Sequence, residues 1–352
     1  MTPNCKLPAL LRATAALACL AIGYTSAASA TAAPDPLYSA YVEPRDLATL
    51  PDGRTIHLFC AGGGSPTVIL TAGFSDWSAQ WGKVFAPIAA HTRTCSWDRA
   101  GYGFSGPGTL PQDVQHTTAD LEAALKAADV TGPYVMVGHS MGGFESLLFT
   151  DKHRDAVVGM VLVDPSIPGQ ARLVKAAAPK FSLAQDQMGE QYIQKKTGCA
   201  ARIESGKLTP GSADPDNCFS YNPDYPKELQ DALQQLDRNP ARWKTRVSAM
   251  TELKRNSEEV ENPQRNYGAM PLRVLGSSDL GEMPTNFDAA TLAQAPAFEA
   301  VFLRGHEALA ALSSRGSHVV VPGTTHYIQL IKPEVVIANV LQVVDETRAG
   351  KK

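Results

Sequence analysis

The stretch VMVGHSMGGFESLLF, residues 135–149, decides how the rest of the chain is interpreted. An apolar run leads into Gly138-His139-Ser140-Met141-Gly142, and a helical pattern follows. A G-x-S-x-G sequence between a strand and a helix is typical of a sharp turn that exposes a reactive serine, because small neighbours let the chains pass. A plain glycine-rich turn is the alternative. The G-x-G-x-x-G and Gly-Lys-Ser/Thr patterns of nucleotide loops are missing, so we predict that Ser140 is a nucleophile.

Strand-like and helix-like segments alternate on both sides of this stretch. This regular alternation predicts an α/β fold with a doubly wound, mostly parallel sheet. The connection at residues 61–66 is interpreted as a hairpin-like turn, and Thr117 or Thr118 is expected to cap a helix. The strands are predicted at residues 55–60, 67–70, 92–97, 134–137, 157–163, 272–275 and 318–321, and helices at 141–152, 297–314 and 333–344.

The alternation stops between residues 165 and 269, which are rich in polar residues and carry helical patches. Because the strand pattern resumes afterwards, an insertion above one end of the sheet explains this segment better than a separate domain. We therefore expect one core made of residues 34–164 and 270–352, with a helical lid at 165–269.

A serine hydroxyl needs a base to accept its proton and an acid to orient that base. In open α/β sheets, functional groups gather at the carboxyl ends of the strands. His326 follows the predicted strand 318–321 in a loop at that end, whereas His318 opens the strand and His306 lies within a helix. We predict His326 as the base.

Two aspartates compete for the role of the orienting acid. Asp279 follows the strand 272–275 through a short polar loop, and this order of serine, acid and histidine is the expected one. Asp164 ends the preceding strand and also points toward the active end, and Glu282 is a further alternative. We predict Asp279.

Charge that develops on a substrate carbonyl needs two backbone N–H groups to stabilise it. Met141 directly follows the nucleophile at the start of a helix, so its amide is one candidate. The loop after the strand 67–70 offers Phe74, whose amide is the other. Phe74 and Met141 are therefore predicted to form the oxyanion hole.

The first 33 residues have the layout of a secretory signal peptide. Lys6 and Arg12 precede an apolar run that is too short to span a membrane, and small residues follow it. Cleavage is expected after Ala30, Ala32 or Ala33, which predicts a secreted or periplasmic protein without a stable membrane anchor. Four cysteines remain after cleavage, and an even number in an oxidising compartment suggests two disulfides with three possible connectivities. The four are Cys60, Cys95, Cys199 and Cys218.

Composition excludes few classes of protein but argues against some partners. The 352 residues carry a formal net charge of -3, which gives no basic surface for nucleic acid. No Cys or His cluster has the spacing of a metal site, so no metal is expected. The oligomeric state is not indicated.

Taken together, these motifs resemble the α/β-hydrolase superfamily, and in particular its lidded esterase, lipase and haloperoxidase-like serine hydrolases. The resemblance covers roughly residues 55–344 and rests on five motifs in the expected order. One departure is that Ala72-Gly73 stands where most such enzymes have His-Gly. The motifs are Ala72-Gly73-Phe74, residues 98–105 (DRAGYGFS), residues 138–142, Gly276-Ser277-Ser278-Asp279 and Gly323-Thr324-Thr325-His326.

The resemblance implies a sheet of about eight strands with the lid inserted after the sixth. It also implies that the strands of Cys60 and Cys95 are neighbours, which favours Cys60–Cys95 and Cys199–Cys218 bridges. The turn at residues 98–105 would be structural. The expected activity is hydrolysis of a small-molecule carboxylic ester without a cofactor. An acyltransferase or perhydrolase would use the same residues, and a non-catalytic binding protein on this fold is a weaker alternative.

Overall fold

The computed structural model describes residues 36–209, 212–214, 216–279 and 287–350. The predicted signal peptide, residues 1–33, lies outside the described residues, and so does Glu282. Those two predictions therefore stay predictions.

One mixed sheet forms the centre of the molecule, in the strand order β1-β2-β4-β3-β5-β6-β7-β8. β1 pairs with β2 and β2 with β4 in antiparallel fashion, and every other pair is parallel. This confirms the predicted mostly parallel sheet. The strands are β1 (Asp46–Thr49), β2 (Thr55–Ala61), β3 (Thr67–Thr71), β4 (Thr94–Trp97), β5 (Tyr134–His139), β6 (Val157–Val163), β7 (Leu272–Ser277) and β8 (Gly316–Val321).

The hairpin predicted at residues 61–66 is wrong, because β4 lies between β2 and β3. The turn residues there were correctly recognised, but turn chemistry alone does not say which strands pair. β1 was missed because it is a short edge strand with one buried residue.

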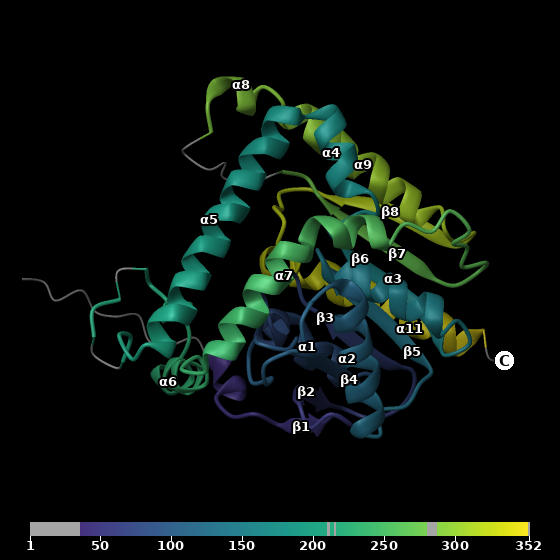
Figure 1. Ribbon diagram of the computed structural model, residues 1–352. Coiled ribbons are helices and arrows are strands. Elements are labelled where there is room, and N and C mark those ends of the chain that lie inside the picture. The colour runs from purple at the N-terminus through teal and green to yellow at the C-terminus, as the bar shows by residue number, and fades with distance from the viewer. Residues whose placement is uncertain (1–35, 210–211, 215, 280–286, 351–352) are drawn as a thin grey trace, which may run out of the picture. The chain divides into compact units, whose positions relative to one another are not determined.

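Helices cover both faces of the sheet (Figure 1). Alternate side chains of the central strands belong to the core on one face or on the other. In β5, Met136 belongs to the core shared with α2, α3 and α9, whereas Val135 and Val137 belong to the core shared with α1 and α11. This period of two is what a strand buried on both faces requires. The helices outside the insertion are α1 (Gly82–Ala89), α2 (Val114–Ala127), α3 (Gly142–Lys152), α8 (Ala289–Leu292), α9 (Ala295–Ala310), α10 (Ile328–Ile331) and α11 (Pro333–Ala349), with short 3₁₀ turns η1 (Pro36–Tyr41) and η2 (Ser78–Trp81).

Asp113, and not Thr117 or Thr118, caps helix α2. Its side chain accepts a hydrogen bond from the backbone of His116, and the two threonines lie one turn inside the helix. An aspartate followed by helical residues is as good a start signal as a threonine, so the sequence allowed either.

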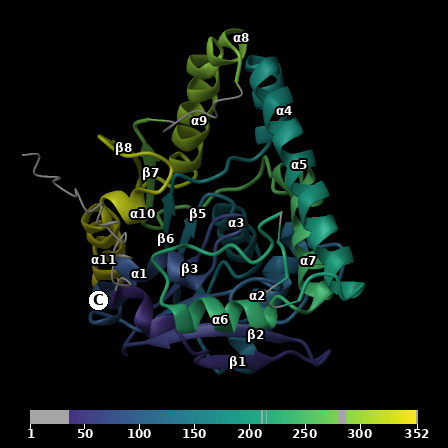
Figure 2. The ribbon, with the colours of Figure 1, turned by 90° about the vertical axis from the view of Figure 1, so that its left-hand side faces the viewer.

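In the described part of the chain between β6 and β7, four helices follow one another, and we call residues 165–271 the helical insertion. They are α4 (Gln170–Ala177), α5 (Pro179–Glu204), α6 (Lys227–Leu236) and α7 (Pro240–Glu259). The 26-residue helix α5 extends as a long arm beside α7 (Figures 1 and 2). Within the described part of the chain, no helix has both the length and the apolar character needed to cross a membrane.

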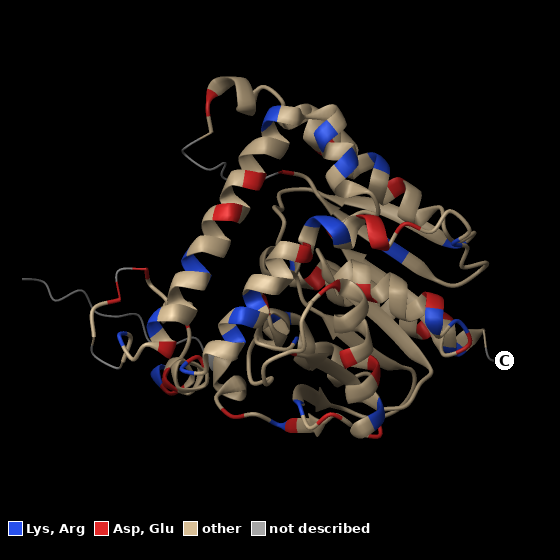
Figure 3. Cartoon of the chain, viewed as in Figure 1, with Lys and Arg blue, Asp and Glu red and all other residues tan. Residues whose placement is uncertain are grey.

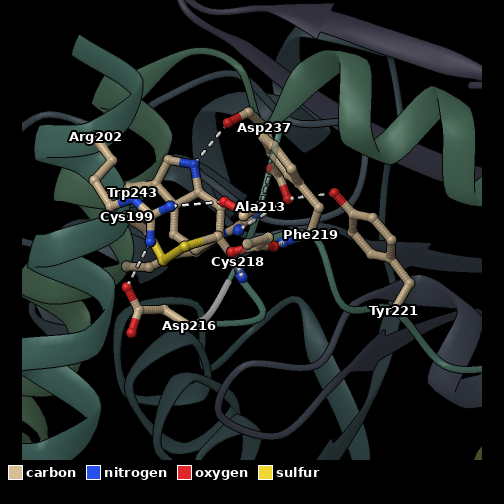
Figure 4. Close-up of a disulfide and its surroundings, with 11 residues drawn as sticks. Cys199, Arg202, Ala213, Asp216, Cys218, Phe219, Tyr221, Asp237 and Trp243 are labelled. Atoms are coloured by element: carbon tan, nitrogen blue, oxygen red, sulfur yellow. Dashed lines mark hydrogen bonds and ion pairs between the residues drawn. A yellow bond between two sulfur atoms is a disulfide. The ribbon is translucent and has the colours of Figure 1, made fainter. Parts of the chain in front are cut away.

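Both predicted disulfides are present. Cys60 and Cys95 are opposite each other in the β2–β4 pair, with their Cα atoms 4.1 Å apart. Cys199, near the end of α5, is bonded to Cys218 in the following loop, and this bridge packs against Trp243 of α7 (Figure 4). The second bridge therefore joins two parts of the helical insertion.

Charged residues are spread over helices and loops throughout the chain (Figure 3). In this view, Lys and Arg residues are intermixed with Asp and Glu residues along the ribbon. This distribution fits the small net charge of -3.

Candidate active site

Ser140 occupies a strained turn between β5 and α3. Its φ angle is 52°, in the left-handed region that non-glycine residues seldom adopt. A Cβ atom on Gly138 would lie 2.4 Å from the carbonyl oxygen of Gly142, and one on Gly142 would lie 2.3 Å from that of Thr71. The turn therefore needs glycine at both positions, for the steric reason that the sequence suggested.

Backbone hydrogen bonds hold this turn on both sides. The Ser140 N–H donates to the carbonyl of Val163 at 3.2 Å. The Ser140 carbonyl accepts from Gly143 and from Ser166, each at 2.9 Å. The strained conformation is thus fixed by the neighbouring strand β6 and by the loop that follows it.

His326 lies in the loop between β8 and α10, at the carboxyl end of the sheet as predicted. Its Nδ1 atom is 2.7 Å from Oδ2 of Asp164. A carboxylate only accepts hydrogen bonds, so Nδ1 carries the hydrogen and Nε2 is left with a lone pair. His326 therefore has the tautomer that a general base for a serine needs.

The aspartate paired with His326 is Asp164, where Asp279 was expected. Asp164 directly follows β6 with a φ angle of 41°, and its Oδ1 accepts the N–H of Ser277 at 2.7 Å. The neighbouring strand β7 continues to Ser277, two residues past the predicted end, and this extension supplies the N–H that orients Asp164. Asp279 instead lies farther along, in the wall of the cavity described below.

The contacts of Asp164 keep its carboxyl ionised. Burial raises the pKa of this carboxyl, but the hydrogen bond and charge of His326 and the N–H of Ser277 outweigh it, so its pKa lies below the usual value. An ionised carboxylate can stabilise the positive charge that forms when His326 accepts a proton.

A cavity of about 700 Å³ contains the serine, the histidine and both aspartates in its wall. Aromatic side chains from α5, α9 and the preceding loop make up much of the remaining surface, and polar groups gather near Ser140. The aromatic residues are Phe181, Phe287, Phe298 and Phe302. A concave apolar site with a few converging polar groups is the usual form of a small-molecule site.

His306 and His318 line the same cavity, although sequence reasoning had set both aside. His306 donates from Nε2 to the carbonyl of Pro165 at 2.9 Å, and the two imidazole rings lie 5.6 Å apart. Burial lowers the pKa of both histidines. The sequence did not indicate that these two histidines face the cavity, because their orientation depends on how α9 packs against β7 and β8.

A second cavity of about 1010 Å³ lies between α4, α5 and α7. Four residues belong to the walls of both cavities, so the two cavities are neighbours. These residues are Ser166, Gln170, Gln185 and Met188.

The predicted oxyanion donors lie on the two expected segments. Met141 is the residue before the first turn of α3, and Phe74 is in the loop after β3. Phe74 packs with Met141 in one small apolar cluster. The ring of Phe74 also contacts Tyr192 of α5, with ring centres 5.8 Å apart. The assignment of the two amides remains a prediction.

Arg99 holds the loop that carries Phe74, a role that sequence reasoning missed. Its guanidinium donates to the carbonyls of Ala72 and Gly73 at 2.6 and 2.8 Å. It also makes two hydrogen bonds with Glu145 of α3, at 2.5 and 2.8 Å. The loop after β3 and the helix after Ser140 are therefore joined through one buried ion pair.

The turn at residues 98–105 is structural, as the resemblance implied. Asp98 is fully buried and accepts hydrogen bonds from His57 at 2.7 Å and from the N–H groups of Ser78 and Phe104 at 2.8 and 2.9 Å. None of these groups lies in the wall of the cavity that contains Ser140.

The helical insertion is attached to this turn by two arginines of α7. Arg242 donates to the carbonyls of Gly103 and Ser105 as well as to Asp237, and Arg246 donates to the carbonyl of Gly101 and also to Asp237. Asp237 lies beside the Cys199–Cys218 bridge (Figure 4). These contacts fix one end of the insertion over the carboxyl end of the sheet.

Comparison with known proteins places the chain in a family. The Alpha/beta hydrolase family matches residues 58–339. An uncharacterized protein of Bacillus subtilis, YqjL, is 35% identical over 117 residues, which are 33% of this chain and 46% of YqjL. The chain thus matches less than half the length of that relative.

Solved structures share the fold at low sequence identity. An esterase from Exiguobacterium antarcticum covers 85% of this chain, and 98% of its own length is matched, at 14% identity and a TM-score of 0.53. An esterase from Thermogutta terrifontis covers 87%, with 99% of its own length matched, at 18% identity and a TM-score of 0.52. The chain therefore belongs to the alpha/beta hydrolase family, and these solved structures show that it shares their fold.

Proposed function

We propose that the chain is an exported serine hydrolase that cleaves a carboxylic ester. The observation that carries this proposal is Ser140, held at a φ angle of 52° in the wall of the cavity that His326 and Asp164 also line. Backbone strain at a buried turn is maintained only where the surroundings enforce it, and such strain gathers at functional sites. The esterases among the structural relatives agree with this reaction but show only the fold.

In the proposed mechanism, the Ser140 hydroxyl attacks the acyl carbonyl while Nε2 of His326 accepts its proton. Asp164 keeps the hydrogen on Nδ1 and stabilises the imidazolium. The amides of Phe74 and Met141 are assigned to the oxyanion. His326 then protonates the departing alcohol, and a water that it activates releases the acid.

The helical insertion is proposed to act as the lid that shapes the substrate site. Its helix α5 contributes Phe181, Gln185 and Met188 to the cavity that contains Ser140. Acyl selection is therefore assigned to α5 and α9.

Export is supported by the two disulfides, since such bonds persist in oxidising compartments. The test is to express the full-length chain in a bacterium and to sequence the amino terminus of the protein found outside the cytoplasm. A mature terminus after Ala30, Ala32 or Ala33 is expected. Retention of an intact Met1 terminus in the cytoplasm would contradict export.

A panel of chromogenic esters of increasing acyl length tests the reaction. Ser140→Ala should lose roughly 10³–10⁶-fold in kcat, whereas Ser205→Ala, at an exposed position after α5, is the matched control. In the presence of an added alcohol, both the free acid and the new ester are quantified. Free acid indicates hydrolysis, and the new ester indicates acyl transfer. Wild-type activity in Ser140→Ala would refute the proposal.

A further inference from the structure

The second cavity, between α4, α5 and α7, comes close to the serine turn although Ser140 is not part of its wall. Phe144 and Ser166 belong to that wall. The N–H of Phe144 donates to the carbonyl of Met141, and the N–H of Ser166 donates to the carbonyl of Ser140, each at 2.9 Å. Two wall residues of the second cavity are thus bonded directly to the turn that carries the proposed nucleophile.

Each of the two cavities has the size of a small-molecule site. The cavity that contains Ser140 has a volume of about 700 Å³ and its neighbour one of about 1010 Å³, and pockets of roughly 300–1,000 Å³ hold drug-sized ligands. An ester has two parts that extend in different directions from the reacting carbonyl carbon. A methyl or ethyl ester would leave one of the cavities without a ligand, so the two volumes fit an ester in which both parts are large.

The wall of the second cavity favours an uncharged ligand. Buried and half-buried apolar side chains from α3, α4, α5 and α7 form part of it, namely Phe144, Val174, Ile193, Met250 and Leu253. Its charged residues carry both signs, and Lys254 of α7 is paired with Asp186 of α5 at 2.7 Å. Because neither sign dominates, a charged ligand would lose its hydration without a matching partner, whereas an apolar chain gains from burial.

The wall that the two cavities share consists of small or unbranched side chains. They are Ser166, Gln170, Gln185 and Met188. Gln185 and Met188 lie one turn apart on α5 and are both exposed, so their side chains can rotate without repacking a core. Unbranched side chains such as that of methionine adapt readily to a ligand. Displacing these two side chains would open a path from one cavity to the other.

We propose that the second cavity binds the alcohol part of the ester, so that the substrates are esters whose acyl and alcohol parts are both large and uncharged. This inference rests on the proposed function, which assigns acyl selection to the cavity that α5 and α9 line. With the acyl part there, the alcohol part extends into the neighbouring cavity. Gly189 of α5 keeps this cavity open, because it belongs to the wall and a Cβ atom on it would have no atom within 4 Å.

Esters of one acyl group with alcohols from methyl to octyl test this subsite. In the wild type, each added methylene should raise kcat/KM about threefold to fourfold until the cavity is filled. Gly189→Trp should flatten the series and lower kcat/KM for the octyl ester at least about tenfold, with the methyl ester unaffected. Gly198→Trp, at an equally open position of α5 outside both cavity walls, is the matched control and should keep the wild-type series. The same series in both variants, or a flattened series of acyl lengths in Gly189→Trp instead, would overturn the proposal.

Binding of ketones, which are not hydrolysed, gives a readout that does not depend on the reaction. In calorimetry, Ser140→Ala should bind dihexyl ketone more tightly than methyl hexyl ketone, and adding Gly189→Trp should remove the difference. Equal affinities for the two ketones in Ser140→Ala overturn the proposal even if esters are cleaved. If the difference is present and depends on Gly189 but no ester is cleaved, the two-part binding site stands and the proposed function alone is refuted.

Discussion

Replacing Asp164 by asparagine separates the two candidate acids of the proposed triad. Asp164 accepts two hydrogen bonds at 2.7 Å, one from the Ser277 N–H and one from Nδ1 of His326. An asparagine has a single acceptor oxygen. The backbone donor at Ser277 cannot rotate away, so the oxygen should remain there and the amide N–H₂ should face His326.

This change favours the imidazole tautomer with its hydrogen on Nε2, the atom that must accept the proton of Ser140. We expect kcat to fall by about 10⁴-fold, equivalent to ~5 kcal/mol of transition-state stabilisation. KM for a chromogenic ester should change little, because neither aspartate oxygen is assigned to substrate binding. Far-ultraviolet circular dichroism and the thermal midpoint would show that the variant is folded.

Asp279→Asn is the matched control, since Asp279 lies in the wall of the same cavity. It should keep kcat within about tenfold of the wild type, because a change in a wall residue alters packing and not the base. If Asp279→Asn instead lost about 10⁴-fold in kcat while Asp164→Asn stayed active, the acid would be Asp279 and the reasoning above would be refuted.

Three further changes test the structure around the site. Gly142→Ala places a Cβ atom 2.3 Å from a backbone oxygen and should cost about 1–3 kcal/mol in urea unfolding and most of the activity, whereas Gly63→Ala, with no atom within 4 Å, should cost neither. Cys199→Ala opens the bridge to Cys218 and should lower the unfolding free energy by about 3 kcal/mol, a difference that a reducing agent should abolish. Arg242→Ala removes a buried cation from its carboxylate and should cost about 3–5 kcal/mol by the same measurement; a loss under about 1 kcal/mol would contradict this.

The fold was predictable because its signals are local and repeated. Buried strands such as β6 are apolar along their whole length, and strand-like and helix-like segments alternate on both sides of the helical insertion. The nucleophile turn was predictable because its glycines are required by sterics. The place of His326 at the carboxyl end of the sheet was predictable because this residue follows a strand that the sequence indicates.

What could not be predicted depends on contacts between segments far apart in the chain. Asp164 and Asp279 follow neighbouring strands, and the choice between them depends on how far β7 extends, which apolar pattern does not reveal. Arg99 lies in a turn that was expected to be structural, and its hydrogen bonds to the loop after β3 and to Glu145 of α3 depend on how these segments pack together. The sequence pattern predicts the helices and strands, but which side chains pair with one another is determined only by the assembled fold.

The attachment of α7 to the turn at residues 101–105 also has a consequence for how the protein unfolds. If α7 separated from this turn, Arg242 and Arg246 would lose their carbonyl partners, and these two cations and Asp237 would have to be solvated by water. The buried Trp243 would also lose its apolar contacts. Opening at this end is therefore costly compared with fraying of a surface loop. We therefore expect the helical insertion to unfold together with the sheet, as one cooperative unit.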